Sequence, residues 1–258
     1  MNLKKNKNLK ITIITACYNS EKTIKTTLNS VFNQTFKEIE HLIIDGKSTD
    51  KTILIAKSYP HIKKIISEPD KGIYDAMNKG IKNASGDIIG FLNSDDLYVN
   101  NEVVSKVVSE FRKDPLLDSC YADLIYVNNL NTSKIVRYFK SSKFKQGLFS
   151  KGWCPPHPTF FVRRSIYEQY GSFDLNYHLA SDFDLMIRFL EIHKIRSLYM
   201  AEPLVKMRMG GATNKNLKNI LQQNLEILNS FHKNSLPINI ISFFINKFIS
   251  RSKQFFKK

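Results

Sequence analysis

The chain carries the sequence IIGFLNSDD at residues 88–96, an apolar run that ends in two neighbouring carboxylates. Ile88 to Leu92 are typical of a buried strand, and the polar residues after them are typical of the loop where a strand ends. Two carboxylates at close range repel each other unless a cation lies between them. Oxygen ligands on a turn suit a hard ion such as Mg²⁺ or Mn²⁺. The alternative is a helix N-cap, because Ser and Asp are favoured there and a helical pattern begins at Asn101.

Strand-like and helix-like segments alternate on the N-terminal side of this run. The predicted strands are residues 11–15, 41–44, 64–66 and 88–92. Each is followed by apolar residues at helical spacing, which in the last case are Val103, Val104, Val107, Val108 and Phe111. Repeated strand–helix units of this length predict an α/β fold with a mostly parallel sheet and helices on both of its faces.

Each predicted strand ends in a polar cluster. The clusters are residues 15–19, 45–50, 68–72 and 93–96. Because the carboxyl ends of parallel strands meet at one edge of the sheet, where ligands of such folds bind, we expect the four clusters to form one site. Neither G-x-G-x-x-G nor G-x-x-x-x-G-K-[ST] occurs, so no glycine-rich phosphate loop is predicted and a metal is expected to organise the phosphates.

The composition narrows the class of protein and its partners. The chain has 258 residues, 42% of them hydrophobic, and a formal charge of +16, which suits nucleic acid, anionic lipid or phosphorylated small molecules. Its three cysteines are far apart, so neither a disulfide framework nor a zinc site is indicated, and a reducing cytoplasm is expected. Lysines before residues 11–16 imitate an export signal, but that apolar run is too short. No segment is apolar and long enough to span a bilayer.

The motifs together resemble those of the family 2 glycosyltransferases, which have the GT-A (nucleotide-diphospho-sugar transferase) fold. The resemblance rests on residues 15–24, 44–52 and 93–96, in the order and spacing of that family. Residues 67–80 are similar to a branch that is common in bacterial surface-polysaccharide assembly. The match covers about residues 9–210 and implies a Rossmann-like sheet flanked by helices, followed here by C-terminal amphipathic helices.

The resemblance also implies roles for residues of the four clusters. The implied nucleotide-sugar site contains Ala16, Tyr18, Glu21, Asp45, Asp70, Gly72, Asp75, Asn93 and Ser94. Asp45 would accept a hydrogen bond from a uracil-like base. The alternatives are an ordinary half-buried aromatic for Tyr18, a loop-capping Asx turn for Asp45, and a turn before a helix for residues 70–75.

The metal motif departs from the family pattern. Asn93 stands where the family has the first Asp of its Asp-x-Asp signature, and an amide adds no negative charge. Asp95 and Asp96 must therefore hold the Mn²⁺ or Mg²⁺ ion that the resemblance implies.

The second half of the chain supplies the expected catalytic base. Asp182 begins a predicted helix and matches the general base of the family, although Ser181 replaces the Glu that usually precedes it. The alternative is that Asp182 only caps this helix. The loop at residues 151–159 carries Trp153 and His157, which suit contact with a sugar acceptor but are equally typical of packing.

The expected organisation is one glycosyltransferase domain at residues 1–232, with a nucleotide-binding half (9–118) and an acceptor half (119–212). Residues 233–258 form a basic amphipathic tail without acidic residues. Such a helix can lie on an anionic bilayer, or it can pack on the catalytic domain or on another subunit of a homo-oligomer. We expect a cytoplasmic enzyme that binds peripherally to the inner face of the cytoplasmic membrane.

The predicted function is that of an inverting, metal-dependent hexosyltransferase. It would move a sugar from a nucleoside diphosphate, UDP in the first instance, to a lipid-linked or lipopolysaccharide or capsule glycan. One alternative is a catalytically silent relative that acts as a membrane scaffold, which Asn93 and Ser181 leave open. A nucleic-acid-binding protein would need basic and aromatic residues interleaved along one face, whereas the lysines here are dispersed, so no nucleic-acid partner is expected.

Overall fold

The computed structural model describes residues 8–210 and 216–256, apart from the side chains of residues 253, 255 and 256. The first half has the expected strand–helix order. Its elements are β1 (Ile11–Cys17), α1 (Ile24–Phe32), β2 (Ile39–Asp45), α2 (Thr52–Lys57), β3 (Ile62–Ser67), α3 (Ile73–Asn83), β4 (Ile88–Phe91), β5 (Leu97–Tyr98) and α4 (Val103–Lys113). The four predicted strands and the helices after them are thereby confirmed.

The second half adds strands of mixed direction and the C-terminal helices. Its strands are β6 (Ser119–Val127), β7 (Ile135–Phe139), β8 (Phe161–Arg163) and β9 (Ser197–Arg208). Its longer helices are α5 (Arg164–Tyr170), α6 (Ser181–Ile187), α7 (Leu217–Lys233) and α8 (Ile240–Phe256), and α6 continues in a π-helical turn, η3 (Arg188–Ile192). Two short 3₁₀ turns, η1 (Phe149–Lys151) and η2 (His157–Thr159), lie in the loop before β8.

All described strands belong to one sheet, in the order β3-β2-β1-β4-β8-β6-β9-β5, with β7 paired to β6. The strands β3, β2, β1 and β4 are mutually parallel, as expected from their helical connections. The strand β8 then runs antiparallel between β4 and β6, while β6 and β9 are parallel to each other. The nucleotide-binding and acceptor halves therefore share a continuous sheet rather than forming separate domains.

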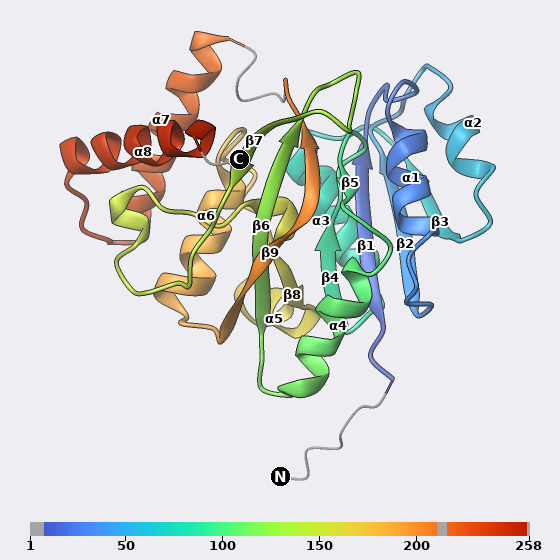
Figure 1. Cartoon of the computed structure of the whole chain (residues 1–258), viewed down its shortest axis with the longest axis horizontal. Coiled ribbons are helices and arrows are strands. Elements are labelled where there is room, and N and C mark those ends of the chain that lie inside the picture. Colours follow the sequence, from blue (N-terminus) through green and yellow to red (C-terminus); the bar gives the residue numbers. More distant parts are fainter. Residues whose placement is uncertain (1–7, 211–215, 257–258) are drawn as a thin grey trace.

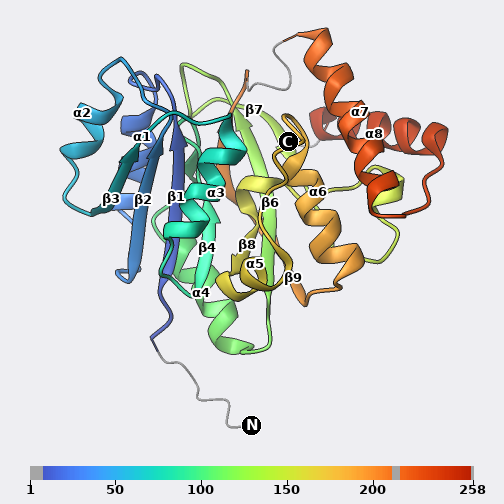
Figure 2. The same cartoon turned by 180° about the vertical axis from the view of Figure 1, so that it is seen from behind.

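Helices cover both faces of the sheet (Figures 1 and 2). The helices α1 and α4 lie on one face and α3, α5 and α6 on the other. Alternate side chains of β1 point to opposite faces of the sheet. Ile11 and Ile13 pack with the valines of α4 on one face, and Ile14 packs with Ala76 and Met77 of α3 on the other. The helix α3 approaches β1 closely at Gly80, where an added methyl group would lie 2.4 Å from Ile14 Cγ2.

The C-terminal tail packs on the catalytic domain through one of its faces. Phe243 of α8 is 1% exposed and belongs to the same core as Phe183 and Phe231. Phe231 lies on α7, which ends at Lys233, so the tail shares a core with the helix that precedes it. None of the helices in the described part of the chain is long and apolar enough to cross a membrane.

Candidate functional site

The four polar clusters lie at one edge of the sheet, as the sequence predicted. Hydrogen bonds join them: the backbone N–H of Asn19 donates to Ser48 Oγ over 2.8 Å, and the Ser20 and Ser94 hydroxyls are 2.8 Å apart. Ser67 Oγ donates to Asp45 Oδ2 over 2.6 Å. The loops after β1, β2, β3 and β4 therefore form one rim.

An exposed aromatic ring and a carboxylate meet at Gly46. A methyl group on Gly46 would lie 2.6 Å from Asp70 Oδ2 and 3.4 Å from Tyr18 Cδ2. Tyr18 is 63% exposed, so it is not the half-buried packing residue that was the alternative. This part of the rim offers a flat aromatic surface beside a hydrogen-bond acceptor.

Asp45 is buried and its carboxylate is largely occupied. It accepts from the backbone N–H of Ser48 over 3.0 Å, from the Ser48 hydroxyl and from the Ser67 hydroxyl. The Cys17 thiol also points at Asp45 Oδ1 from 3.7 Å, and burial followed by the Asp45 charge raises the pKa of that thiol. Asp45 therefore ties the loop after β2 to the end of β3.

Two other predicted site residues hold backbone groups at helix starts. Glu21 Oε2 accepts from the backbone N–H of Lys51 over 3.0 Å, just before α2. Asp75 accepts from the backbone N–H of Lys71 over 3.0 Å and lies 3.5 Å from Lys79 Nζ. Gly72 precedes α3 with a φ of +113°, and Ala16 is buried near the end of β1. These four residues shape the rim.

Of the acidic pair after β4, Asp96 is buried and short of partners, and Asp95 is half-buried. Asp96 is fully buried, and in the described part of the chain neither of its carboxylate oxygens has a hydrogen-bond partner; the same holds for Asn93 Oδ1. Burial, and then the charge of Asp95, raise the pKa of Asp96, while burial raises the pKa of Asp95. Arg208 at the end of β9 partly offsets both effects.

This arrangement fits a divalent cation. The buried Asp96 carboxylate, which has no hydrogen-bond partner among the described residues, carries a large desolvation cost that a bound cation removes. Within residues 8–210 and 216–256, no three His, Cys, Asp or Glu side chains come together, so Asp95 and Asp96 would provide the protein ligands and a diphosphate the remaining oxygens. Arg208 was not predicted as a site residue.

Asp182 lies in the first turn of α6 and accepts a hydrogen bond from a tyrosine of α3. The Tyr74 hydroxyl donates to Asp182 Oδ1 over 2.8 Å, between residues 108 positions apart. Burial and the Asp182 charge raise the pKa of Tyr74, so it stays a donor at neutral pH. Since Tyr74 is two residues beyond Gly72, this contact joins Asp182 to the rim.

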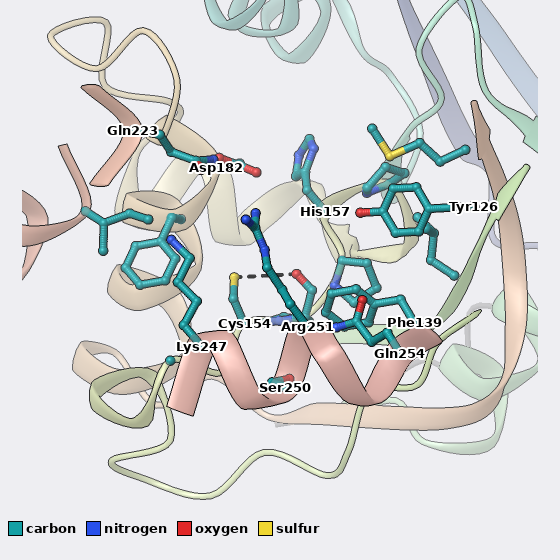
Figure 3. A pocket seen from close by; sticks show the side chains of 18 of the residues that line it. Tyr126, Phe139, Cys154, His157, Asp182, Gln223, Lys247, Ser250, Arg251 and Gln254 are labelled. Carbon is teal, nitrogen blue, oxygen red and sulfur yellow. Dashed lines mark hydrogen bonds between the residues drawn. The ribbon is translucent and has the colours of Figure 1, made fainter. Parts of the chain in front are cut away.

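Asp182 faces a pocket of about 240 Å³ (Figure 3). His157 lies beside it at the start of η2, with its ring 5.4 Å from that of Phe91, the last residue of β4. Burial lowers the pKa of His157, and Asp182 partly opposes this, so the imidazole is neutral at pH 7. The pocket therefore contains two residues predicted from sequence, Asp182 and His157.

Trp153 does not line this pocket. Its ring packs against Tyr121, Phe144 and Phe149 at centroid distances of 5.4–5.8 Å. The indole completes an aromatic cluster under the loop, as the packing alternative describes, and contact of Trp153 with an acceptor sugar stays a prediction. A single Trp on a proline-rich loop does not reveal which way the ring turns.

The opposite wall of the pocket comes from α8. Lys247, Ser250, Arg251 and Gln254 line it, and Figure 3 shows Arg251 extending from the helix toward Asp182 and His157. None of these four residues was predicted as part of the site. Their spacing of three to four residues marks one helix face, but the same pattern also describes a helix lying on a membrane.

Comparison with known proteins identifies the class. Residues 12–171 match the family Glycosyl transferase family 2. An uncharacterized glycosyltransferase of Mycobacterium tuberculosis is 31% identical over 181 residues, which cover 69% of this chain and 68% of that protein.

Two solved structures have the same fold. Residues 1–349 of TarS from S. aureus, in complex with UDP-GlcNAc, match with a TM-score of 0.66 at 20% identity and cover 86% of this chain and 66% of that one. The mannosyltransferase PcManGT from Pyrobaculum calidifontis, in complex with GDP-Man and Mn²⁺, matches with a TM-score of 0.64 at 14% identity and covers 96% and 74%.

Proposed function

The chain belongs to glycosyl transferase family 2 and is a glycosyltransferase with the GT-A fold, and from this premise we propose that it transfers a sugar from a nucleoside diphosphate to a glycan with inversion. One observation carries the proposal. The rim formed after β1–β4 continues, through the hydrogen bond from Tyr74 to Asp182, into a pocket that holds a carboxylate. Donor and acceptor can thus bind side by side.

The donor is proposed to bind along the rim as a UDP-sugar. Tyr18 would stack on the base, and Asp70 would accept from the base or ribose. Asp45 would shape this site through the loops that it joins, although the sequence also favoured a direct bond to the base. The complexes of two fold relatives with UDP-GlcNAc and with GDP-Man support a nucleotide sugar as the donor class.

Asp182 is proposed as the general base. The Tyr74 hydroxyl occupies Oδ1 and orients the carboxylate, so Oδ2 would take the proton of the acceptor hydroxyl. The acceptor oxygen would form a bond to the anomeric carbon while the bond to the diphosphate breaks, and the electron pair leaves with the nucleoside diphosphate. A single displacement of this kind inverts the anomeric centre.

A divalent cation is part of the proposal. Asp95 and Asp96 would hold Mn²⁺ or Mg²⁺, with Asn93 Oδ1 nearby as a neutral oxygen. When bound, the ion offsets the negative charge that develops on the leaving diphosphate.

The acceptor is proposed to be lipid-linked, as in lipopolysaccharide or capsule assembly, with the enzyme on the inner face of the cytoplasmic membrane. The outer side of α8 exposes Ile241, Ile245 and Phe248, with Phe248 72% exposed, and α7 exposes Leu217, Leu221 and Leu225. Exposed apolar side chains on a protein with a formal charge of +16 suit an anionic bilayer.

Flotation with phosphatidylglycerol vesicles tests this membrane role. The wild type should float with the vesicles, and the double variant Ile241→Ser/Phe248→Ser should not. Equal flotation would refute the membrane role, and a change in oligomeric state instead would assign this face to a second copy.

A panel of nucleotide sugars tests the main proposal. Thermal stabilisation and donor hydrolysis would be measured with and without Mn²⁺ for the wild type, Asp95→Ala and Asp182→Asn. We expect one UDP-sugar to stabilise the wild type only when Mn²⁺ is present, and Asp95→Ala to abolish this. Asp182→Asn should keep donor binding and lose transfer. If no nucleotide sugar binds, or if Asp182→Asn transfers at the wild-type rate, the assignment is wrong.

A further inference from the structure

The helix α8 is built into the pocket rather than attached beside it. Phe243, Lys247, Arg251 and Gln254 recur at intervals of three to four residues, so they share one helix face. Phe243 anchors this face in the core, with its ring 5.8 Å from that of Phe231. At Gly152, where φ is +76°, an added methyl group would lie 3.0 Å from the backbone N of Lys247 and the backbone O of Phe243. The pocket loop and α8 therefore touch through their backbones.

Two cations of this face enter the pocket without a carboxylate partner. Lys247 Nζ donates to the neutral Asn224 Oδ1 over 2.7 Å, and none of the ion pairs found among the described residues includes Arg251. Asp182 is the one carboxylate among the described residues that line the pocket. Burial, followed by the charge of Arg251, lowers the pKa of Lys247 to about 8. Lys247 is half-buried and Arg251 is exposed, and two neighbouring positive charges repel each other unless an anion joins them.

Gln254 gives an independent indication that a ligand binds here. It is 8% exposed and lines the same pocket, and its Oε1 has no hydrogen-bond partner among the described residues. A buried amide oxygen without a donor destabilises the fold. A hydroxyl group of a bound sugar would supply the missing donor.

The position of the two cations indicates that they contact the acceptor and not the donor. The pocket is lined by Asp182 and His157 but by none of Tyr18, Asp70 and Asp95, the residues proposed to bind the nucleotide. An anion beside Lys247 and Arg251 would therefore belong to the molecule whose hydroxyl reaches Asp182. Arg presents a planar fork of donors that fits phosphate or carboxylate oxygens.

We propose that Lys247 and Arg251 of α8 bind a phosphate or carboxylate group of the acceptor, so that the enzyme selects an anionic acceptor. This rests on the proposed function, since it assumes that Asp182 receives the proton of an acceptor hydroxyl. The anion has two possible sources, namely the diphosphate that joins a glycan to its lipid carrier, or a phosphate or uronate within the glycan.

Direct binding tests the proposal without any need for turnover. Isothermal titration calorimetry would compare glucose 1-phosphate, glucuronic acid and methyl glucoside with the wild type, Arg251→Gln and Lys247→Met. We expect the anionic probes to bind more tightly than methyl glucoside, and each variant to weaken them by roughly tenfold or more. Lys218→Gln removes one charge from an exposed position on α7 outside the pocket and should bind like the wild type. Unchanged thermal midpoints show that the variants fold.

Transfer assays then identify the source of the anion. If Arg251→Gln lowers kcat/KM only for a neutral glycan that is joined to a prenyl diphosphate, the anion is the diphosphate of the lipid carrier. If it lowers kcat/KM only for a glycan that itself bears a phosphate or uronate, the anion belongs to the glycan. Equal binding of anionic and neutral probes by the wild type overturns the proposal. So does an Arg251→Gln variant that weakens only UDP-sugar binding, or only binding to phosphatidylglycerol vesicles. If no UDP-sugar binds but the anionic probes still bind more tightly than methyl glucoside, the donor assignment is wrong and the assignment of Lys247 and Arg251 to an anion stands.

Discussion

Lowering the pH from 7 to 5 should destabilise the fold through His41, a buried histidine of β2. Its Nε2 lies 3.0 Å from Thr15 Oγ1 and its Nδ1 lies 3.0 Å from His61 Nε2, and the side chain is fully buried. Burial, followed by the neighbouring His61, lowers the pKa of His41 from 6.5 to about 3. The folded protein therefore keeps this ring neutral, whereas the unfolded chain takes up a proton as the pH falls below 6.5.

The size of the effect follows from these two values. The stabilisation is complete above pH 6.5 and is lost progressively as the pH falls toward 3. At pH 5 the unfolded histidine is almost fully protonated and the folded one is not, which costs about 2 kcal/mol. A folded pKa one unit higher would change this figure little, because pH 5 would still lie above it. Since the m-value in urea is roughly 3 kcal/mol/M for a chain of this size, the contribution of His41 alone should lower the urea midpoint by roughly 0.7 M.

Urea unfolding at pH 7 and pH 5 measures the loss of unfolding free energy, and a comparison of the wild type with His41→Asn isolates the part due to His41. His41→Asn removes the titrating ring while His61, whose pKa is also lowered by burial, continues to titrate. The wild type should lose about 2 kcal/mol more than His41→Asn between the two pH values. His178→Asn changes an exposed histidine and should behave like the wild type. If His41→Asn loses as much stability as the wild type, the buried neutral ring is not the cause.

Three substitutions, together with one control, test the site and the helix that supports it. Tyr74→Phe removes the donor to Asp182 and should lower kcat roughly tenfold at an unchanged KM for the donor, since a hydrogen bond to a charged group is lost; steady-state kinetics with an unchanged kcat would contradict this. Tyr18→Ala should weaken UDP-sugar binding roughly tenfold by calorimetry, and equal affinity would exclude stacking. Phe243→Ala should cost about 3–5 kcal/mol in chemical denaturation, while Phe248→Ala, at a position 72% exposed, should stay within about 0.5 kcal/mol; equal effects would show that α8 is not anchored through Phe243.

Local patterns were sufficient for the first half of the fold. The strand at residues 88–92 and the helix with Val103, Val107 and Phe111 are each recognisable from about ten residues, because apolar spacing alone decides which side of an element is buried. Parallel strands then bring residues 15–19, 45–50, 68–72 and 93–96 to one edge whatever the details of packing. Asp182 was found by motif order, since it follows the loops at the expected distance along the chain.

The antiparallel insertion of β8 between β4 and β6 could not be predicted from local apolar spacing. The strand is three residues long, and the residues of β4 and β6 that pair with it lie at least 41 positions away along the chain. Trp153 illustrates the same limit for a side chain: composition marks the indole as large and apolar, but only the surrounding rings of Tyr121 and Phe149 determine that it points into the core.

The amino-acid sequence by itself determined the strand–helix order, the rim with its acidic pair, and the membership in a glycosyltransferase family. The tertiary structure alone decided which residues complete the site: Tyr74 meets Asp182 across 108 positions, and Lys247 and Arg251 turn toward the pocket while Ile241 and Phe248 face outward. The reason is physical. Periodicity records that a helix has two unlike faces, but the free energy of burying either face depends on the surface that it meets, and that surface exists only after the sheet has formed.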